Sequence, residues 1–162
     1  MNLKIAIIGS GPSAFYTAQS LLKQEIDYEI DIIEKLFSPY GLIRYGVAPD
    51  HQSTKNVTRV FERVLNNPKV EFFGAIEINN SPSIDDLMEV YDAVVIATGM
   101  AQDKKLNINE HNKDGYYGAT QFVNWYNGHP EYENLNPNLN VESAIIIGNG
   151  NVAIDCARLL VK

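Results

Sequence analysis

Two glycine-rich turns, one near each end of the chain, have the residue types and spacing of phosphate-binding loops. The first is Gly9-Ser10-Gly11-Pro12-Ser13-Ala14 and the second is Gly148-Asn149-Gly150-Asn151-Val152-Ala153. Each follows a run rich in β-branched residues and precedes a helical pattern, and this context gives weight to a short motif. Glycines here let the main chain turn tightly and approach a pyrophosphate, which the N–H groups of a helix N-terminus attract. Two such turns predict two dinucleotide sites.

An acidic residue, Glu34, ends the second strand pattern about 20 residues after the first turn, where a carboxylate can accept hydrogen bonds from ribose hydroxyls. An acid in this place suits a free 2′-hydroxyl, as in FAD or NAD, and repels the 2′-phosphate of NADP. The structural alternative is a tight turn that binds nothing, with Glu34 as a solvated strand end. No comparable acid or arginine follows the second turn, so local chemistry does not choose between NAD and NADP there.

The elements that must position these turns are short buried strands alternating with amphipathic helices. Apolar runs predict strands at 3–8, 28–34, 70–73, 75–78 and 93–97, with a new strand beginning at Ala144. Helices are predicted from Pro12 to Leu22, over 53–65, after a capping box at Ser83 and Asp86, around 120–126, and after Gly150. Strand, glycine turn, helix and strand in succession predict an α/β fold with a parallel sheet.

The composition of the chain changes sharply after the strand that ends at 97. From 103 to 140 it is rich in Asn, Gly, Pro and Tyr, as in a connecting segment over a surface. We therefore expect a Rossmann-like dinucleotide-binding domain over 1–102. The connector and the beginning of a second Rossmann-like domain should occupy 103–162.

Overall composition excludes several classes of protein. The net charge is −7 and the basic residues are scattered, so a nucleic-acid partner is not expected. A single cysteine, Cys156, allows no internal disulfide and no cysteine-ligated cluster within the chain. No apolar run approaches the length of a membrane span and no signal peptide precedes the first strand, so the cytoplasm is the expected location. We propose no metal site.

Longer stretches between the two turns resemble the adrenodoxin-reductase type of ferredoxin–NADP reductase. The most diagnostic is Gly41-Leu42-Ile43-Arg44-Tyr45-Gly46-Val47-Ala48-Pro49-Asp50-His51; Glu34-Lys35, Phe122-Val123-Asn124-Trp125-Tyr126-Asn127-Gly128 and the second glycine turn also match. The resemblance covers essentially the whole chain. It implies a flavoprotein that moves electrons between NADPH and a ferredoxin-type iron–sulfur protein.

The same resemblance assigns residues to FAD and NADP. Gly9, Gly11, Pro12 and Ser13 would cover the FAD pyrophosphate, Glu34 would take the adenosine ribose, and Leu42 and Ile78 would line the flavin site, with Lys35, Gly41 and Gly99 as further FAD-binding candidates. Gly148, Asn149, Gly150, Asn151 and Val152 would hold the pyrophosphate of NADP. Ser13 and Ala14 stand where the family usually has Ala-Gly, a change between small residues.

The resemblance further places His51 and Asp155 near the meeting point of nicotinamide and flavin. They would tune that site without reacting covalently, because hydride passes directly between the two cofactors. Taken alone, His51 would be interpreted as a surface histidine and Asp155 as an acid favoured by a helix N-terminus.

We therefore expect the N-terminal portion of a ferredoxin–NADP reductase. Because the family closes its flavin site with later segments, we expect these 162 residues alone to bind FAD weakly and to show little NADPH-dependent turnover. Two alternatives remain. One is a flavoprotein like the small subunit of glutamate synthase, and the other is a non-catalytic remnant that only binds a nucleotide or a partner.

Overall fold

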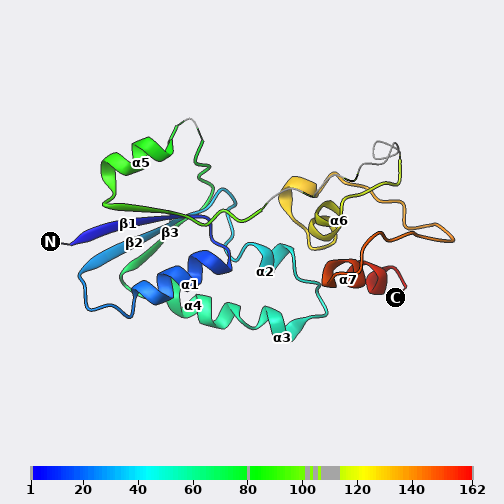
Figure 1. Cartoon of the computed structure of the whole chain (residues 1–162), viewed down its shortest axis with the longest axis horizontal. Helices are drawn as coiled ribbons and strands as arrows, with labels where there is room; N and C mark the ends of the chain where they lie inside the picture. The colour runs from blue at the N-terminus through cyan, green and yellow to red at the C-terminus, as the bar shows by residue number, and fades with distance from the viewer. Residues whose placement is uncertain (1, 80, 101–102, 104–105, 107–113, 162) are drawn as a thin grey trace. The chain divides into compact units, whose positions relative to one another are not determined.

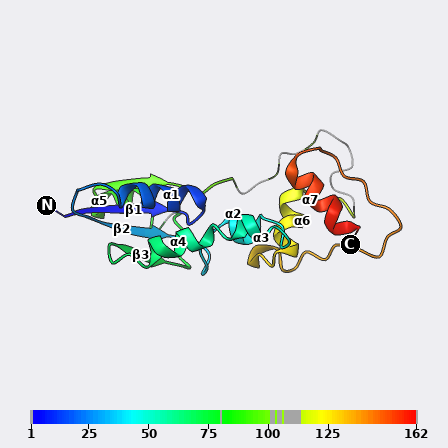
Figure 2. The same cartoon turned by 90° about the horizontal axis from the view of Figure 1, so that it is seen from below.

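The computed structural model describes residues 2–79, 81–100, 103, 106 and 114–161 of the chain. It forms two compact units, each described by itself below (Figures 1 and 2). The first unit contains residues 1–44 and 52–100, and the second contains residues 45–51 and 101–162. Among the described residues, no helix combines the length and the apolar character that crossing a membrane requires.

The first unit is built on a four-stranded parallel sheet. Its strands are β1 (Leu3–Ile8), β2 (Tyr28–Ile33), β3 (Val70–Phe73) and β4 (Ala93–Ile96), in the order β3-β2-β1-β4. Ile5 of β1 pairs with Ile30 on one side and with Ala93 on the other. The parallel α/β sheet predicted from the sequence is therefore confirmed, and the strands that carry the first glycine turn and Glu34 are neighbours.

Helices cover both faces of this sheet, as Figure 1 shows. On one face lie α1 (Pro12–Leu21) and α4 (Thr58–Leu65), where Phe15 stacks on Phe61 with ring centroids 4.6 Å apart. On the other face lies α5 (Ile84–Val90), whose Leu87 packs with Ala6, Ile8 and Ile33. Because the β1 and β2 side chains alternate between two covered faces, most residues of both strands are apolar.

The predicted capping box is present at the start of α5. The Ser83 hydroxyl accepts from the Asp86 N–H at 3.1 Å, and the Asp86 carboxylate accepts from the Ser83 N–H at 2.7 Å. These bonds to its charged form lower the pKa of Asp86. The start of this helix is thus encoded locally.

The helix predicted over 53–65 is interrupted. The structure has α3 (Gln52–Lys55) and then α4, which begins at Thr58. The Thr58 hydroxyl donates to the Lys55 carbonyl at 3.0 Å, so a side chain occupies an oxygen that a continuous helix would give to a backbone N–H. The apolar periodicity was correct, but it did not reveal this competition.

Two predicted strands are wrong. Residues 75–78 form no strand because Ala75 has a φ of +60°, which breaks the extended conformation; Ile76 and Ile78 still pack on the α5 side of the sheet. The segment from Ala144 to Ile147 is apolar but irregular, and Ile145 is 91% exposed. In the described part of the second unit no strand lies beside it to complete a ladder.

The second unit consists of α6 (Ala119–Tyr126), the short 3₁₀ helix η1 (Pro130–Tyr132), α7 (Asn151–Leu160) and the segment Tyr45–His51. A short helix, α2 (Leu42–Tyr45), precedes this segment along the chain. Helices α6 and α7 pack together, as both views show (Figures 1 and 2). Helices were predicted at both places, whereas α2 was not predicted.

Gly9 has a backbone that other residues rarely adopt. Its φ is +101°, and a Cβ atom at this position would overlap the main-chain carbonyl of Ala97. Gly11, two residues later, has a φ of −80° and no atom within 4 Å of a Cβ. The two glycines are therefore required for different reasons.

We expect Gly9→Ala to lower the free energy of unfolding by at least about 2 kcal/mol, because it adds backbone strain and an overlap. Gly11→Ala should cost less than about 1 kcal/mol. Urea unfolding followed by circular dichroism measures both, and equal losses would contradict this account of the turn.

Candidate functional site

The first glycine turn presents an uncapped helix N-terminus at the carboxyl end of β1. Gly11 is the N-cap residue of α1, and among the described residues no side chain caps this helix. Pro12 occupies its first turn, a position where a missing N–H costs nothing. The remaining N–H groups of that turn and the positive end of the helix dipole suit an anionic group.

Glu34 lies directly against this turn. Its Oε2 accepts hydrogen bonds from the Ser10 N–H at 3.0 Å and from the Ser10 hydroxyl at 2.6 Å. Its Oε1 accepts from the Leu36 N–H at 3.1 Å. A carboxylate has about four acceptor positions, so this one is fixed in place and can still accept a hydrogen bond.

The contact between Ser10 and Glu34 was not predicted from the sequence. The Ser10 side chain is fully buried, with 0% exposed, and it connects the turn after β1 to the end of β2 through Glu34. The available signal was a hydroxyl residue between the two glycines, in the same unit as an acid at a strand end. That pattern does not say which of the many possible partners the hydroxyl finds.

A second loop closes on the same turn. The Tyr40 N–H donates to the Ser10 carbonyl at 3.0 Å, and a Cβ on Gly41 would lie 3.0 Å from the Gly11 Cα. Tyr40 and Gly41 both have positive φ, +91° and +45°. The structure therefore brings Gly41 beside the first glycine turn, as expected for a loop over a bound nucleotide.

Lys55 fixes the chain that follows this loop. Its Nζ donates to the carbonyls of Ile43 at 3.0 Å and Arg44 at 3.1 Å, which end the short helix α2. Burial, followed by the nearby Arg44 charge, lowers the pKa of Lys55. Lys55 therefore holds the backbone of this segment in place.

The other predicted FAD-binding residues are more scattered. Leu42 is 58% exposed, Ser13 and Lys35 are exposed, and Gly99 has a φ of +70° just beyond β4. Ile78 is half-buried against the cluster formed by α5 and the sheet. Their assignment to a cofactor remains a prediction.

The second glycine turn also leads into an uncapped helix. Gly148 has a φ of +137°, and Gly150 is the N-cap residue of α7, with no side chain of the described residues capping it. Asn149 is exposed, as are Asn151 and Val152 in the first turn of the helix. The arrangement matches an anion site, while its ligand remains a prediction.

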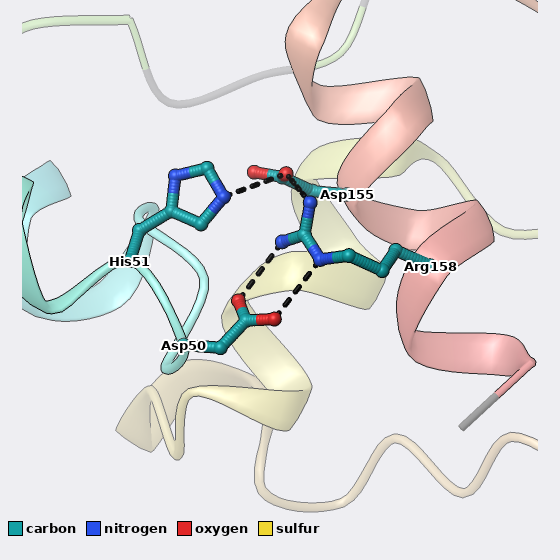
Figure 3. A network of polar contacts seen from close by, with 4 residues as sticks. All are labelled: Asp50, His51, Asp155 and Arg158. Atoms are coloured by element: carbon teal, nitrogen blue, oxygen red, sulfur yellow. Dashed lines mark hydrogen bonds and ion pairs between the residues drawn. The ribbon is translucent and has the colours of Figure 1, made fainter.

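His51 and Asp155, predicted as a pair, lie together within the second unit, and two further residues join them (Figure 3). His51 Nε2 is 3.5 Å from Asp155 Oδ1. Arg158 contacts Asp155 Oδ1 with Nη1 at 2.9 Å, and both oxygens of Asp50 with Nε and Nη2 at 2.9 Å each. Sequence reasoning missed Asp50 and Arg158. The signal for Arg158 was its spacing of three residues from Asp155 on a helix.

The Tyr126 hydroxyl lies near the same cluster. It is buried and, among the described residues, has no hydrogen-bond partner. Burial, and then the charges of Cys156, Asp155 and Asp50, raise the pKa of Tyr126 to about 12, although Arg158 opposes this. Burial also raises the pKa of the Cys156 thiol, so both groups stay neutral near pH 7.

The cluster can hold and orient one imidazole. The side chain of His51 is 44% exposed and faces a carboxylate that is only 16% exposed. The Asp155 carboxylate therefore sets the orientation of the His51 imidazole.

Comparison with known proteins identifies the family of the chain. The family described as "Pyridine nucleotide-disulphide oxidoreductase" matches residues 3–162. NADPH-ferredoxin reductase FprA of Mycobacterium tuberculosis is 45% identical over 161 residues, which cover 96% of this chain and 35% of that protein. Mitochondrial NADPH:adrenodoxin oxidoreductase of Arabidopsis thaliana is 44% identical, with 99% and 33% covered. The chain thus spans about a third of the length of these relatives.

Solved structures give the same result. The structure "Mycobacterium tuberculosis FprA in complex with NADPH" superposes with a TM-score of 0.95 at 43% identity, covering 98% of this chain and 36% of that one. Histamine dehydrogenase from Rhizobium, at 17% identity and a TM-score of 0.54, shows likeness of fold alone.

We expect Tyr126→Phe to leave the free energy of unfolding unchanged or to raise it slightly, because it removes a buried hydroxyl that has no partner. Tyr91→Phe is the matched control. The Tyr91 hydroxyl donates to Asp31 Oδ2 at 2.8 Å, so its loss should cost about 1 kcal/mol. Thermal unfolding of both variants measures the difference, and a larger loss in Tyr126→Phe would show that this hydroxyl has a partner in solution.

Proposed function

Since the chain belongs to the pyridine nucleotide-disulphide oxidoreductase family, we propose that it serves in passing electrons from NADPH through FAD to a ferredoxin-type iron–sulfur protein. The names of the two relatives support both the nicotinamide donor and the class of acceptor. The cytoplasmic location stays a prediction, because one of these relatives is mitochondrial by name.

The observation that carries the proposal is the Glu34 carboxylate at the first glycine turn. Ser10 holds this carboxylate with two hydrogen bonds beside the uncapped end of α1. The arrangement offers N–H donors for a pyrophosphate and an acceptor for a ribose within one turn. A negative carboxylate disfavours a 2′-phosphate, which supports FAD over NADP at this turn.

The second turn supports NADP by a weaker argument. Its uncapped helix N-terminus suits a pyrophosphate, and the NADPH of the relatives supplies the identity of the dinucleotide. When both cofactors are bound, their own chemistry supplies hydride transfer from nicotinamide to flavin. We assign His51 and Asp155 to orientation and to proton handling near the reacting rings, with no covalent step on either residue.

FAD titration tests the first site. We expect Gly11→Ala to weaken FAD binding at least about tenfold, because a Cβ obstructs the pyrophosphate while nothing in the protein obstructs the Cβ. Glu34→Gln should weaken binding by a similar factor through the ribose, and the exposed Glu89→Gln on α5 should have no effect. Quenching of flavin fluorescence provides the dissociation constants.

Two further measurements test the reaction itself. Because these 162 residues alone are expected to bind FAD weakly and to show little turnover, the reaction is measured in a longer protein that contains them. In that FAD-loaded protein, NADPH should bleach the visible flavin absorbance in a single anaerobic turnover, and NADH should do so more slowly. Absence of saturable FAD binding, or equal binding by Gly11→Ala and the unaltered protein, would refute the proposed function.

A further inference from the structure

We propose that Arg158 is a positioning residue, which clamps Asp50 and Asp155 together and thereby fixes His51 against the Asp155 carboxylate. The part of this inference that concerns electron transfer rests on the proposed function, whereas the clamp itself does not. Neither Arg158 nor Asp50 was among the residues predicted from the sequence.

The clamp uses three nitrogen atoms of one guanidinium group (Figure 3). Nε and Nη2 bind the two oxygens of Asp50 at 2.9 Å each, which is the bidentate geometry of an arginine and a carboxylate. Nη1 binds Asp155 Oδ1 at 2.9 Å. Because the guanidinium is planar and rigid, fixing one carboxylate also fixes the direction of the other.

The two carboxylates come from distant parts of the chain. Arg158 and Asp155 are three residues apart on α7, so helix geometry alone brings them to one face. Asp50 lies 108 residues earlier and is bonded to His51 through the peptide backbone. Holding Asp50 therefore holds the backbone from which the His51 side chain projects.

Contacts at the other end of the segment 45–51 make the clamp effective. The Asn127 side chain donates to the Tyr45 carbonyl at 3.0 Å, and the Tyr45 ring packs on His129 with centroids 4.7 Å apart. Ala48, between the two ends, is fully buried. With its first residue held by α6 and η1, the segment still needs an anchor beside His51, and Asp50 provides it.

Asp155 is shared unequally between its two partners. The Arg158 nitrogen is 2.9 Å from Oδ1, whereas His51 Nε2 is 3.5 Å from the same oxygen. Arg158 therefore sets the orientation of the carboxylate, and His51 adapts to it. The hydrogen bond with Asp50 raises the pKa of Arg158, so the guanidinium remains charged near neutral pH.

Ion pairs at a protein surface generally add little stability. The side chains of Arg158, Asp50 and Asp155 are only 31%, 29% and 16% exposed, and their geometry is well defined. We therefore expect the clamp to act on position more than on stability, and this difference makes the proposal testable.

Nuclear magnetic resonance of the three histidines provides the test. In the cofactor-free protein, Arg158→Gln and Asp50→Asn should each shift the His51 ring signals and remove the cross-relaxation between the His51 ring and the Asp155 side chain. The double variant should shift them no further, because both changes remove the same contact. Arg158→Lys should restore the signals only in part, since an ammonium cannot form the fork.

Two controls distinguish a change in the placement of His51 from a general loss of structure. The His129 signals should stay unchanged, because its Nδ1 accepts from the Glu131 N–H in a separate contact. Arg63→Gln, at an exposed arginine of α4, should leave His51 unchanged. If Arg158→Gln does not fold, the His51 ring signals of Asp50→Asn alone test the proposal. Unchanged His51 signals in the folded variants, or additive shifts in the double variant, would overturn the proposal.

Kinetics extend the test to the reaction. In the FAD-loaded protein, Arg158→Gln should slow flavin reduction by NADPH about 10- to 100-fold and leave the KM for NADPH within about twofold, as expected from a misplaced group. A raised KM with an unchanged rate would overturn the positioning role in catalysis. This measurement also uses the longer protein that contains these 162 residues. If that protein without substitutions does not reduce its flavin, the proposed function fails, and the magnetic resonance comparison alone tests the clamp.

Discussion

The hydrogen bonds between Ser10 and Glu34 are the constraint on which the first unit depends. They join the end of β1 to the end of β2 at the point where the sheet gives way to loops. The Ser10 carbonyl accepts a hydrogen bond from the Tyr40 N–H, and the Glu34 carboxylate accepts one from the Leu36 N–H. Two loops are therefore attached to the same pair of residues. The half-buried Glu34 carboxylate is costly to disturb, because each of its donors would lose a charged partner. The first glycine turn is thus held in place by the protein's own hydrogen bonds.

Different interactions stabilise the interior of each of the two units. The first has two apolar clusters, in which Phe15, Phe61 and the isoleucines of β1 and β2 are almost fully buried. The second buries a smaller and more polar set, which includes Asn124 and His129. Hydrogen bonds, ring contacts and the clamp of Arg158 contribute more of its order. Such a unit is more sensitive to the loss of one polar contact.

Features encoded by neighbouring residues were predictable from the sequence, and features that need a distant partner were not. The glycine turns, the capping box at Ser83 and the strands of the sheet follow local rules. The segment at Ala144 has every property of a strand except a neighbour to pair with, and pairing is what makes a strand. In the candidate site, His51 and Asp155 followed from family resemblance. Ser10, Asp50 and Arg158 were missed because their roles depend on which group folding brings to each of them.

The membership of residues 45–51 in the second unit has a consequence for the order of events during synthesis. Asp50 leaves the ribosome 108 residues before Arg158, which at ordinary rates of translation is a delay of roughly 5 to 20 s. During that interval the sheet of the first unit can form, whereas Asp50 cannot yet contact Arg158. The histidine of the candidate site thus acquires its final surroundings only after α7 has been made.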